Sequence, residues 1–211
     1  MKPWRKILVR AVVFSSLLFT LVRSEAQGTL QWNVTFDGSP PIARSTEVAT
    51  NYYAEQGMEF RPIGNGQFGR SGGAAADFFP RNGSAYLVAF SGYSLAASYV
   101  SGQRFGVVSV DLAEFSTLYQ TPLTVQFVGY RPDGSTVSTA FVTDGVIDGA
   151  GPLADFQTFY LDSQFADVVR VEVPPIGWSL DNMVFSQVPE PATSALLFVG
   201  ASLLWALRFR R

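Results

Sequence analysis

Between residues 28 and 186 the chain alternates apolar and polar residues in short runs. The first run, LQWNVTF at residues 30–36, places Leu, Trp, Val and Phe at every second position. This period of two is typical of a strand with one buried face. We therefore expect about nine strands, the other eight at residues 57–62, 84–90, 105–112, 122–130, 135–142, 156–161, 167–173 and 179–185.

The breaks between these runs are rich in Gly, Pro, Asn and Ser. In the tetrapeptide RPDG at residues 131–134, proline suits the first central turn position and glycine the left-handed one, which predicts a hairpin. No long segment with the helical period of 3.6 residues occurs before the C-terminal apolar run. Many short strands at this spacing favour an all-β fold, an antiparallel β-sandwich of the jelly-roll type, over residues 27–187.

The longest stretch without clear alternation covers residues 63–82, and we expect a loop there. Within it, Gly64, Gly66 and Gly69 match the spacing of a dinucleotide-binding fingerprint. That motif has to open a helix in a βαβ unit, whereas Ser, Gly and Gly follow here. The match is therefore rejected.

The first 26 residues have the layout of a secretory signal peptide. A basic start, an apolar run from Ala11 to Val22 and the small residues Ser24 and Ala26 form the three regions of such a signal. The apolar run is shorter than the ~20 residues of a membrane span. We expect cleavage by signal peptidase after Ala26, and an uncleaved signal anchor is the alternative.

A second apolar run, sixteen residues from Ala192 to Leu207, precedes the basic residues Arg208, Arg210 and Arg211. As a helix it would cover ~24 Å, which suits a transmembrane helix if the bilayer thins slightly. The arginines would remain in the cytoplasm, because cytoplasmic flanks of membrane spans are enriched in basic residues. The run therefore predicts an anchor that holds an exported precursor at the inner membrane.

Directly before this span stand Pro189, Glu190 and Pro191. The two prolines hold the backbone extended and prevent the helix from continuing backwards. The order of motif, short apolar helix and arginine-rich end over residues 188–211 resembles the PEP-CTERM sorting signal of Gram-negative bacteria. This resemblance implies cleavage near the motif by an exosortase and delivery to the cell surface or the extracellular matrix. A plain single-span anchor is the alternative.

The amino-acid composition restricts the catalytic and metal-binding groups that the protein can use. The sequence contains no cysteine and no histidine, which excludes disulfides, thiolate zinc sites and histidine bases, so any metal site must use oxygen ligands. Residues 27–188 contain seven arginines, no lysine and fifteen acidic residues, a net charge of −8. This charge disfavours nucleic-acid binding and suits cations.

The run WSLDNMVF at residues 178–185 contains a candidate metal site. In many carbohydrate-binding jelly rolls an aspartate on the last strand helps to hold a structural calcium ion, and Asp181 with Asn182 loosely resembles this pattern. The resemblance implies a partner acid from the first strands, Asp37 or Glu47, within a shell of about six to eight oxygens around Ca²⁺. In the alternative, Asp181 makes strand-end hydrogen bonds and no metal binds.

Tyrosines in or beside the predicted loops are candidates for stacking on sugars, although ordinary packing at the edge of the core is the alternative for most of them. They are Tyr52, Tyr53, Tyr86, Tyr93 and Tyr99. A Ser-His-Asp triad would lack its histidine, and no G-x-S-x-G motif occurs. Two of the acids could form a glycosidase pair, but the sequence does not show which of them lie close together.

These features predict an exported, non-catalytic protein of the cell surface or extracellular matrix, with extracellular polysaccharide as a candidate ligand. The alternative is a secreted glycoside hydrolase or another polysaccharide-acting enzyme. Residues 1–26, 27–187 and 188–211 are expected to be the signal peptide, the sandwich domain and the sorting signal.

Overall fold

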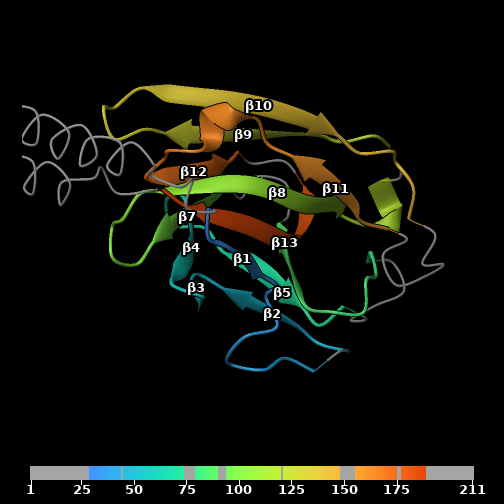
Figure 1. The fold of residues 1–211 in the computed structure, drawn as a ribbon. Coiled ribbons are helices and arrows are strands. Elements are labelled where there is room, and N and C mark those ends of the chain that lie inside the picture. The colour runs from blue at the N-terminus through green and yellow to red at the C-terminus, as the bar shows by residue number, and fades with distance from the viewer. Residues whose placement is uncertain are drawn as a thin grey trace, which may run out of the picture. The chain divides into compact units, whose positions relative to one another are not determined.

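Two antiparallel sheets pack face to face in the computed structural model of the chain (Figure 1). The structure describes residues 29–43, 45–73, 79–89, 94–119, 121–147, 155–174 and 177–188. Residues Leu30–Val188 form one compact unit. The predicted signal peptide at 1–26, the motif at 189–191, the span at 192–207 and the basic tail at 208–211 lie outside the described residues.

The larger sheet has seven strands. Its order is β11 (Gln157–Tyr160), β8 (Phe105–Glu114), β13 (Trp178–Gln187), β6 (Tyr86–Ala89), β5 (Phe68–Ser71) and β2 (Glu47–Thr50), and β1 (Gln31–Val34) also pairs with β13. The second sheet has the order β10 (Thr136–Val142), β9 (Thr124–Tyr130), β12 (Arg170–Val173), β7 (Leu95–Tyr99), β4 (Met58–Pro62) and β3 (Tyr53–Glu55). Two short 3₁₀ helices, η1 (Thr117–Tyr119) and η2 (Ser163–Phe165), lie in the connections.

The core lies between the two sheets and is rich in aromatic side chains. Phe60 and Phe127 enter it from the six-stranded sheet, and Trp178 and Phe185 enter it from β13. All four side chains are fully buried, and their neighbours along the strands face outward. The alternation in the sequence thus reflects the burial of one face of each sheet against the other.

The predicted fold class is confirmed, since the described residues form an antiparallel β-sandwich. Each of the nine predicted runs contains a strand. The predicted hairpin also forms, between β9 and β10. Its turn closes with a 3.0 Å hydrogen bond from Gly134 N to Arg131 O, and Gly134 has a φ of 83°, which glycine adopts without a steric penalty.

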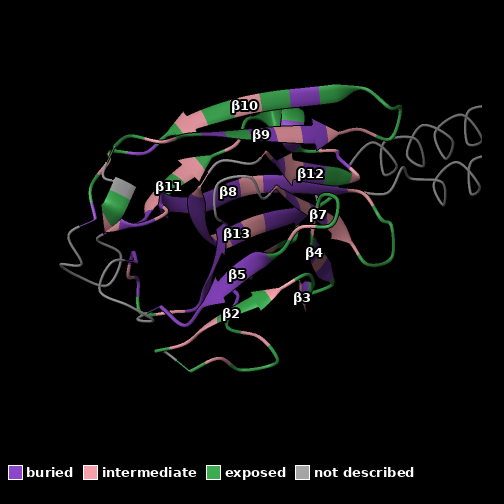
Figure 2. Ribbon diagram, turned by 180° about the vertical axis from the view of Figure 1, so that it is seen from behind, coloured by how far each residue is buried: buried purple, intermediate pink, exposed green. Residues whose placement is uncertain are grey.

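The sequence did not predict four strands, β2, β3, β5 and β7. The expectation of a loop throughout 63–82 is wrong, because β5 lies within it and all four of its residues are buried (Figure 2). Glycine is needed at position 69, where a Cβ atom would lie 2.6 Å from both Glu47 Oε1 and Val88 Cγ1. A second apolar cluster, which includes Phe79, Tyr86 and Phe156, lies on the outer face of the larger sheet. Because this part of the sheet is covered on both faces, the strands in it do not alternate between buried and exposed residues.

Within the described part of the chain, no helix is long and apolar enough to cross a membrane.

Candidate functional site

Asp181, the central residue of the predicted metal site, is fully buried on β13. Its Oδ1 accepts a 2.7 Å hydrogen bond from the backbone N–H of Asn182. Its Oδ2 accepts a 3.0 Å hydrogen bond from Ser84 Oγ and another from Asn82 Nδ2. Both carboxylate oxygens are therefore engaged by groups of the protein.

Asn182 belongs to a chain of polar contacts across four strands of the larger sheet. Its Nδ2 donates to Asp111 Oδ2 at 2.8 Å, and its Oδ1 accepts from Asn33 Nδ2 at 3.2 Å. Thr158 donates to the other oxygen of Asp111 at 2.6 Å. The amide of Asn182 thus links β1 to β8, and Asp111 extends the link to β11.

The other two predicted ligands take different positions. Asp37 is exposed, and its Oδ1 accepts a 2.8 Å hydrogen bond from Ala85 N. Asp37 and Asp181 therefore hold the same short segment, residues 82–85. Glu47 lies on β2, opposite Ser71, and burial raises the pKa of its carboxyl group.

The described acidic residues near Asp181 do not form a cluster that would bind a cation readily. Among the residues that the structure describes, no three acidic side chains come close enough together to hold a metal ion. Burial raises the pKa of Asp181 to about 8, with Asp111 adding a smaller increase, which favours the neutral carboxyl group at neutral pH. A calcium ion at Asp181 would have to displace both the proton and the present hydrogen-bond donors, so calcium binding stays a prediction.

The candidate tyrosines separate into buried and exposed residues. Tyr53 and Tyr86 are buried, and their hydroxyl groups donate to Glu55 Oε2 at 2.8 Å and to Pro80 O at 2.9 Å. Burial raises the pKa of both hydroxyl groups, and neither ring can stack on a polymer. Tyr99 packs edge-on against Trp32 beside the core, and Tyr93 lies outside the described residues.

Tyr52 is 43% exposed and borders a surface that the sequence pattern did not indicate. This surface is the outer face of the six-stranded sheet, where two rows of side chains cross the strands. The first row consists of Tyr130, Arg170, Ser98, Glu59 and Ala54. The second row consists of Val128, Glu172, Ala96 and Arg61, and Tyr52 continues it beyond the start of β3.

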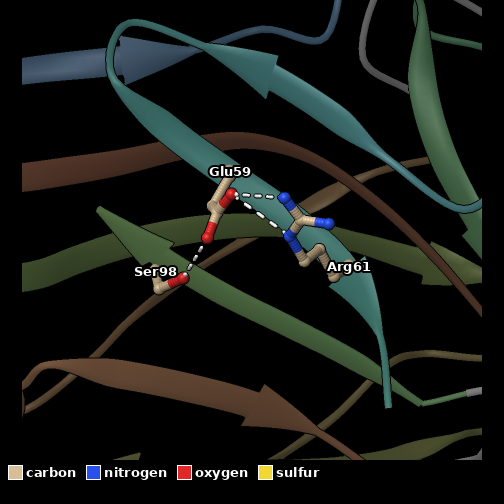
Figure 3. A network of polar contacts seen from close by, with 3 residues as sticks. All are labelled: Glu59, Arg61 and Ser98. Carbon is tan, nitrogen blue, oxygen red and sulfur yellow. Dashed lines mark hydrogen bonds and ion pairs between the residues drawn. The ribbon is translucent and has the colours of Figure 1, made fainter. Parts of the chain in front are cut away.

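The first group of contacts on this face joins β4 to its neighbours. Arg61 donates from Nη2 and Nε to Glu59 Oε2, at 3.0 and 3.1 Å (Figure 3). Ser98 on β7 donates to the other oxygen of Glu59 at 3.2 Å. The guanidinium carbon of Arg61 also lies 4.5 Å from the centroid of the Tyr52 ring. We call Tyr52, Arg61 and Glu59 the first triplet.

A second triplet, Tyr130, Arg170 and Glu172, lies on β9 and β12. Arg170 Nη2 is 2.6 Å from Glu172 Oε1, and the Tyr130 hydroxyl donates to Glu172 Oε2 at 2.8 Å. The guanidinium carbon of Arg170 lies 4.3 Å from the centroid of the Tyr130 ring. The same three residue types therefore make the same ion pair and the same stacking contact twice on one face.

The two triplets lie on either side of β7, whose outward residues are Ala96 and Ser98. Small side chains in the middle leave the longer tyrosine and arginine side chains on both sides accessible. The side chains of Arg61 and Arg170 are 56% and 46% exposed. We call the two triplets together with Ala96 and Ser98 the tyrosine–arginine face.

The sequence shows charged residues on the exposed side of two strands of this face, but it does not show that they lie close together. Glu59 and Arg61 alternate with core residues in GMEFRP, and Arg170 and Glu172 do the same in DVVRVEV. Two charges on the exposed side of a strand are common, and they indicate no partner by themselves. Only the order of the strands brings the two pairs to opposite sides of β7.

No protein-family model matches the chain, and no curated protein matches it in sequence. Solved structures similar to it include a family 29 carbohydrate-binding module, with a TM-score of 0.38 and 11% identity over 74% of this chain and 90% of that one. Another is the family 32 module from C. perfringens NanJ in complex with galactose, with a TM-score of 0.32 and 12% identity over 74% of this chain and 99% of that one.

Proposed function

We propose that the sandwich domain binds polysaccharide through the tyrosine–arginine face. The observation that carries this proposal is the pair of triplets, each with an aromatic ring stacked on an ion-paired guanidinium at an exposed position. A sugar ring offers apolar C–H groups on its faces and hydroxyl groups around its edge. A suitable surface therefore combines flat apolar side chains with a few well-oriented polar groups.

The polar groups of this face are held in place before any ligand arrives. Glu59 accepts from both Arg61 and Ser98, and Glu172 accepts from Tyr130 and pairs with Arg170. Side chains that are already ordered lose less conformational entropy on binding, which increases affinity. Each guanidinium is paired with a carboxylate, so the face suits uncharged, hydroxyl-rich chains better than acidic ones.

Binding of the purified full-length protein to neutral glucan, mannan and xylan tests this proposal. Tyr52→Ala and Tyr130→Ala should each weaken binding by about 5- to 30-fold, or about 1–2 kcal/mol, as expected when an aromatic contact of the binding surface is removed. Tyr160→Ala is the matched control, because Tyr160 is 73% exposed but lies on β11 of the other sheet. Unchanged affinity in the double variant Tyr52→Ala/Tyr130→Ala would refute the proposal.

We propose that this binding occurs without catalysis. Glu59 and Glu172 are paired with arginines, and Asp181, the acid whose pKa is raised to about 8, is fully buried and cannot contact a polymer. An assay of reducing ends released from the bound polysaccharide should give the value of a protein-free control. Release that exceeds the control and survives repurification would favour the glycoside hydrolase instead.

For localisation, we propose export through the signal peptide at 1–26 and processing by an exosortase at Pro189, Glu190 and Pro191. The support is the order of motif, apolar run and arginines in the sequence. Glu190→Ala should leave export intact but retain the protein at the inner membrane with its C-terminal segment attached. Fractionation and mass spectrometry of the C-terminus test this, and normal release of the variant would contradict it.

A further inference from the structure

The two triplets are related by an approximate two-fold rotation about an axis normal to the sheet through β7. In the first row, Arg170 on β12 and Glu59 on β4 lie on opposite sides of Ser98. In the second row, Glu172 on β12 and Arg61 on β4 lie on opposite sides of Ala96. Half a turn about that axis therefore places each arginine on the other arginine and each glutamate on the other glutamate.

The tyrosines obey the same relationship. Tyr130 follows Arg170 in the first row, toward β9, and Tyr52 follows Arg61 in the second row, on the β3 side. The ring-to-guanidinium distances are also alike, at 4.3 and 4.5 Å. The rotation thus relates all three members of one triplet to those of the other.

This relationship belongs to the side chains and not to the backbone. Strands β4 and β12 both run antiparallel to β7, so they run in the same direction and no two-fold axis normal to the sheet relates them. The arrangement arises because the charges occur in opposite order, as Glu-x-Arg in β4 and as Arg-x-Glu in β12. Two segments more than a hundred residues apart therefore present a nearly symmetric set of groups.

A polysaccharide chain has a direction, because one end is reducing and the other is not. Half a turn about an axis normal to the face reverses any chain that lies on it. Because the same rotation exchanges the two triplets, the reversed chain meets the same kinds of groups in the same places. We propose that the tyrosine–arginine face binds a glycan chain in both directions, an inference that rests on the proposed function.

Differences between the triplets limit how equal the two directions are. Besides its arginine, Glu59 accepts a hydrogen bond from the hydroxyl group of Ser98, whereas Glu172 accepts one from the hydroxyl group of Tyr130. The centre is also unequal, with a hydroxyl group at Ser98 and a methyl group at Ala96. One hydrogen bond contributes about 0.5–1.5 kcal/mol, so the two directions should differ in population by no more than about tenfold.

Hexasaccharides that carry a nitroxide at the reducing end distinguish the two directions. Cellohexaose, mannohexaose and xylohexaose, labelled in this way, would be added to isotope-labelled full-length protein, and amide signals would be followed by NMR. We expect broadening both in Tyr53–Glu55, beside the first triplet, and in Thr124–Tyr130, beside the second. An excess of the unlabelled hexasaccharide should remove the broadening from both segments.

Broadening of one segment only, with full competition, would overturn the inference while leaving the proposed function in place. A hexasaccharide that binds with the same affinity to Tyr52→Ala/Tyr130→Ala as to the unaltered protein would overturn both. Failure of all three hexasaccharides and their parent polysaccharides to bind would also overturn both. The control Tyr160→Ala should show the same two broadened segments as the unaltered protein.

Discussion

Arg61 lies over the ring of Tyr52, with its guanidinium carbon 4.5 Å from the ring centroid. A planar guanidinium can stack in this way and donate to Glu59 from two nitrogens at once, whereas an ammonium group cannot. Arg61→Lys should therefore release the Tyr52 ring and weaken polysaccharide binding by about 3- to 10-fold, while changing the free energy of unfolding by less than ~1 kcal/mol. Affinity measurements and thermal melts test this together, and full binding by Arg61→Lys would contradict it.

Arg70 is a buried cation of the sandwich, and it holds the segment that follows β1. It donates to Phe36 O at 2.6 Å, to Gly38 O at 2.7 Å and to Pro40 O. Its guanidinium carbon also lies 4.9 Å from the centroid of the Tyr53 ring. Arg70→Ala should lower the free energy of unfolding by about 2–4 kcal/mol, because several carbonyl groups would lose their donor.

The control for this variant is Arg104→Ala, which removes a partly exposed ion pair with Asp167 at 2.9 Å. Such surface pairs contribute about 0–1 kcal/mol, so chemical denaturation should separate the two variants clearly. Equal losses in both variants would show that Arg70 does not hold the segment in the way described.

Asp181 should make stability fall as the pH rises. Its carboxyl group titrates near 3.8 in the unfolded chain and near 8 in the folded protein, so the folded protein binds the proton more tightly. The resulting stabilisation is complete below about pH 4 and is lost as the pH rises through about 8. The melting temperature should therefore fall by several degrees between about pH 5 and about pH 9.

Asp181→Asn should remove much of this slope, because the amide does not ionise. Asp133→Asn is the control, since hydrogen bonds from Ser135 lower the pKa of Asp133 and keep it charged throughout that range. Melting curves of the three proteins at several pH values test the prediction. A slope in Asp181→Asn equal to that of the unaltered protein would assign the pH dependence to other groups.

Calcium binding at Asp181 and Asn182, predicted from the sequence, has a separate test. At a calcium concentration one hundred times the dissociation constant, linkage adds about 2.7 kcal/mol to the free energy of unfolding. The increase in melting temperature should be larger above about pH 8, where Asp181 loses its proton, and absent in Asp181→Ala. Identical melts with calcium and with chelator would leave Asp181 with the hydrogen-bonding role seen in the structure.

The strands that the sequence predicted correctly are mostly those with one face toward the core. In β9 and β10 the alternation of side chains is a local consequence of the extended backbone, so period and turn residues were sufficient. Strand β5 has no such pattern, because Phe68 and Arg70 point inward while Gly69 and Ser71 are covered on the other side. The second face of β5 is covered by residues far away in the chain, and its own glycine, arginine and serine give this short run no strand pattern.

For the candidate sites, too, the sequence determined local features and the tertiary structure determined which residues come together. The sequence alone determined that Asp181 and Asn182 lie on a strand, and that the domain carries excess negative charge. Tertiary structure decided that Asp181 would be enclosed by Asn82 and Ser84, almost a hundred residues earlier in the chain. It also decided that Glu59 and Arg61 would face Glu172 and Arg170 across β7, because the order and register of strands depend on long-range hydrogen bonds between backbones.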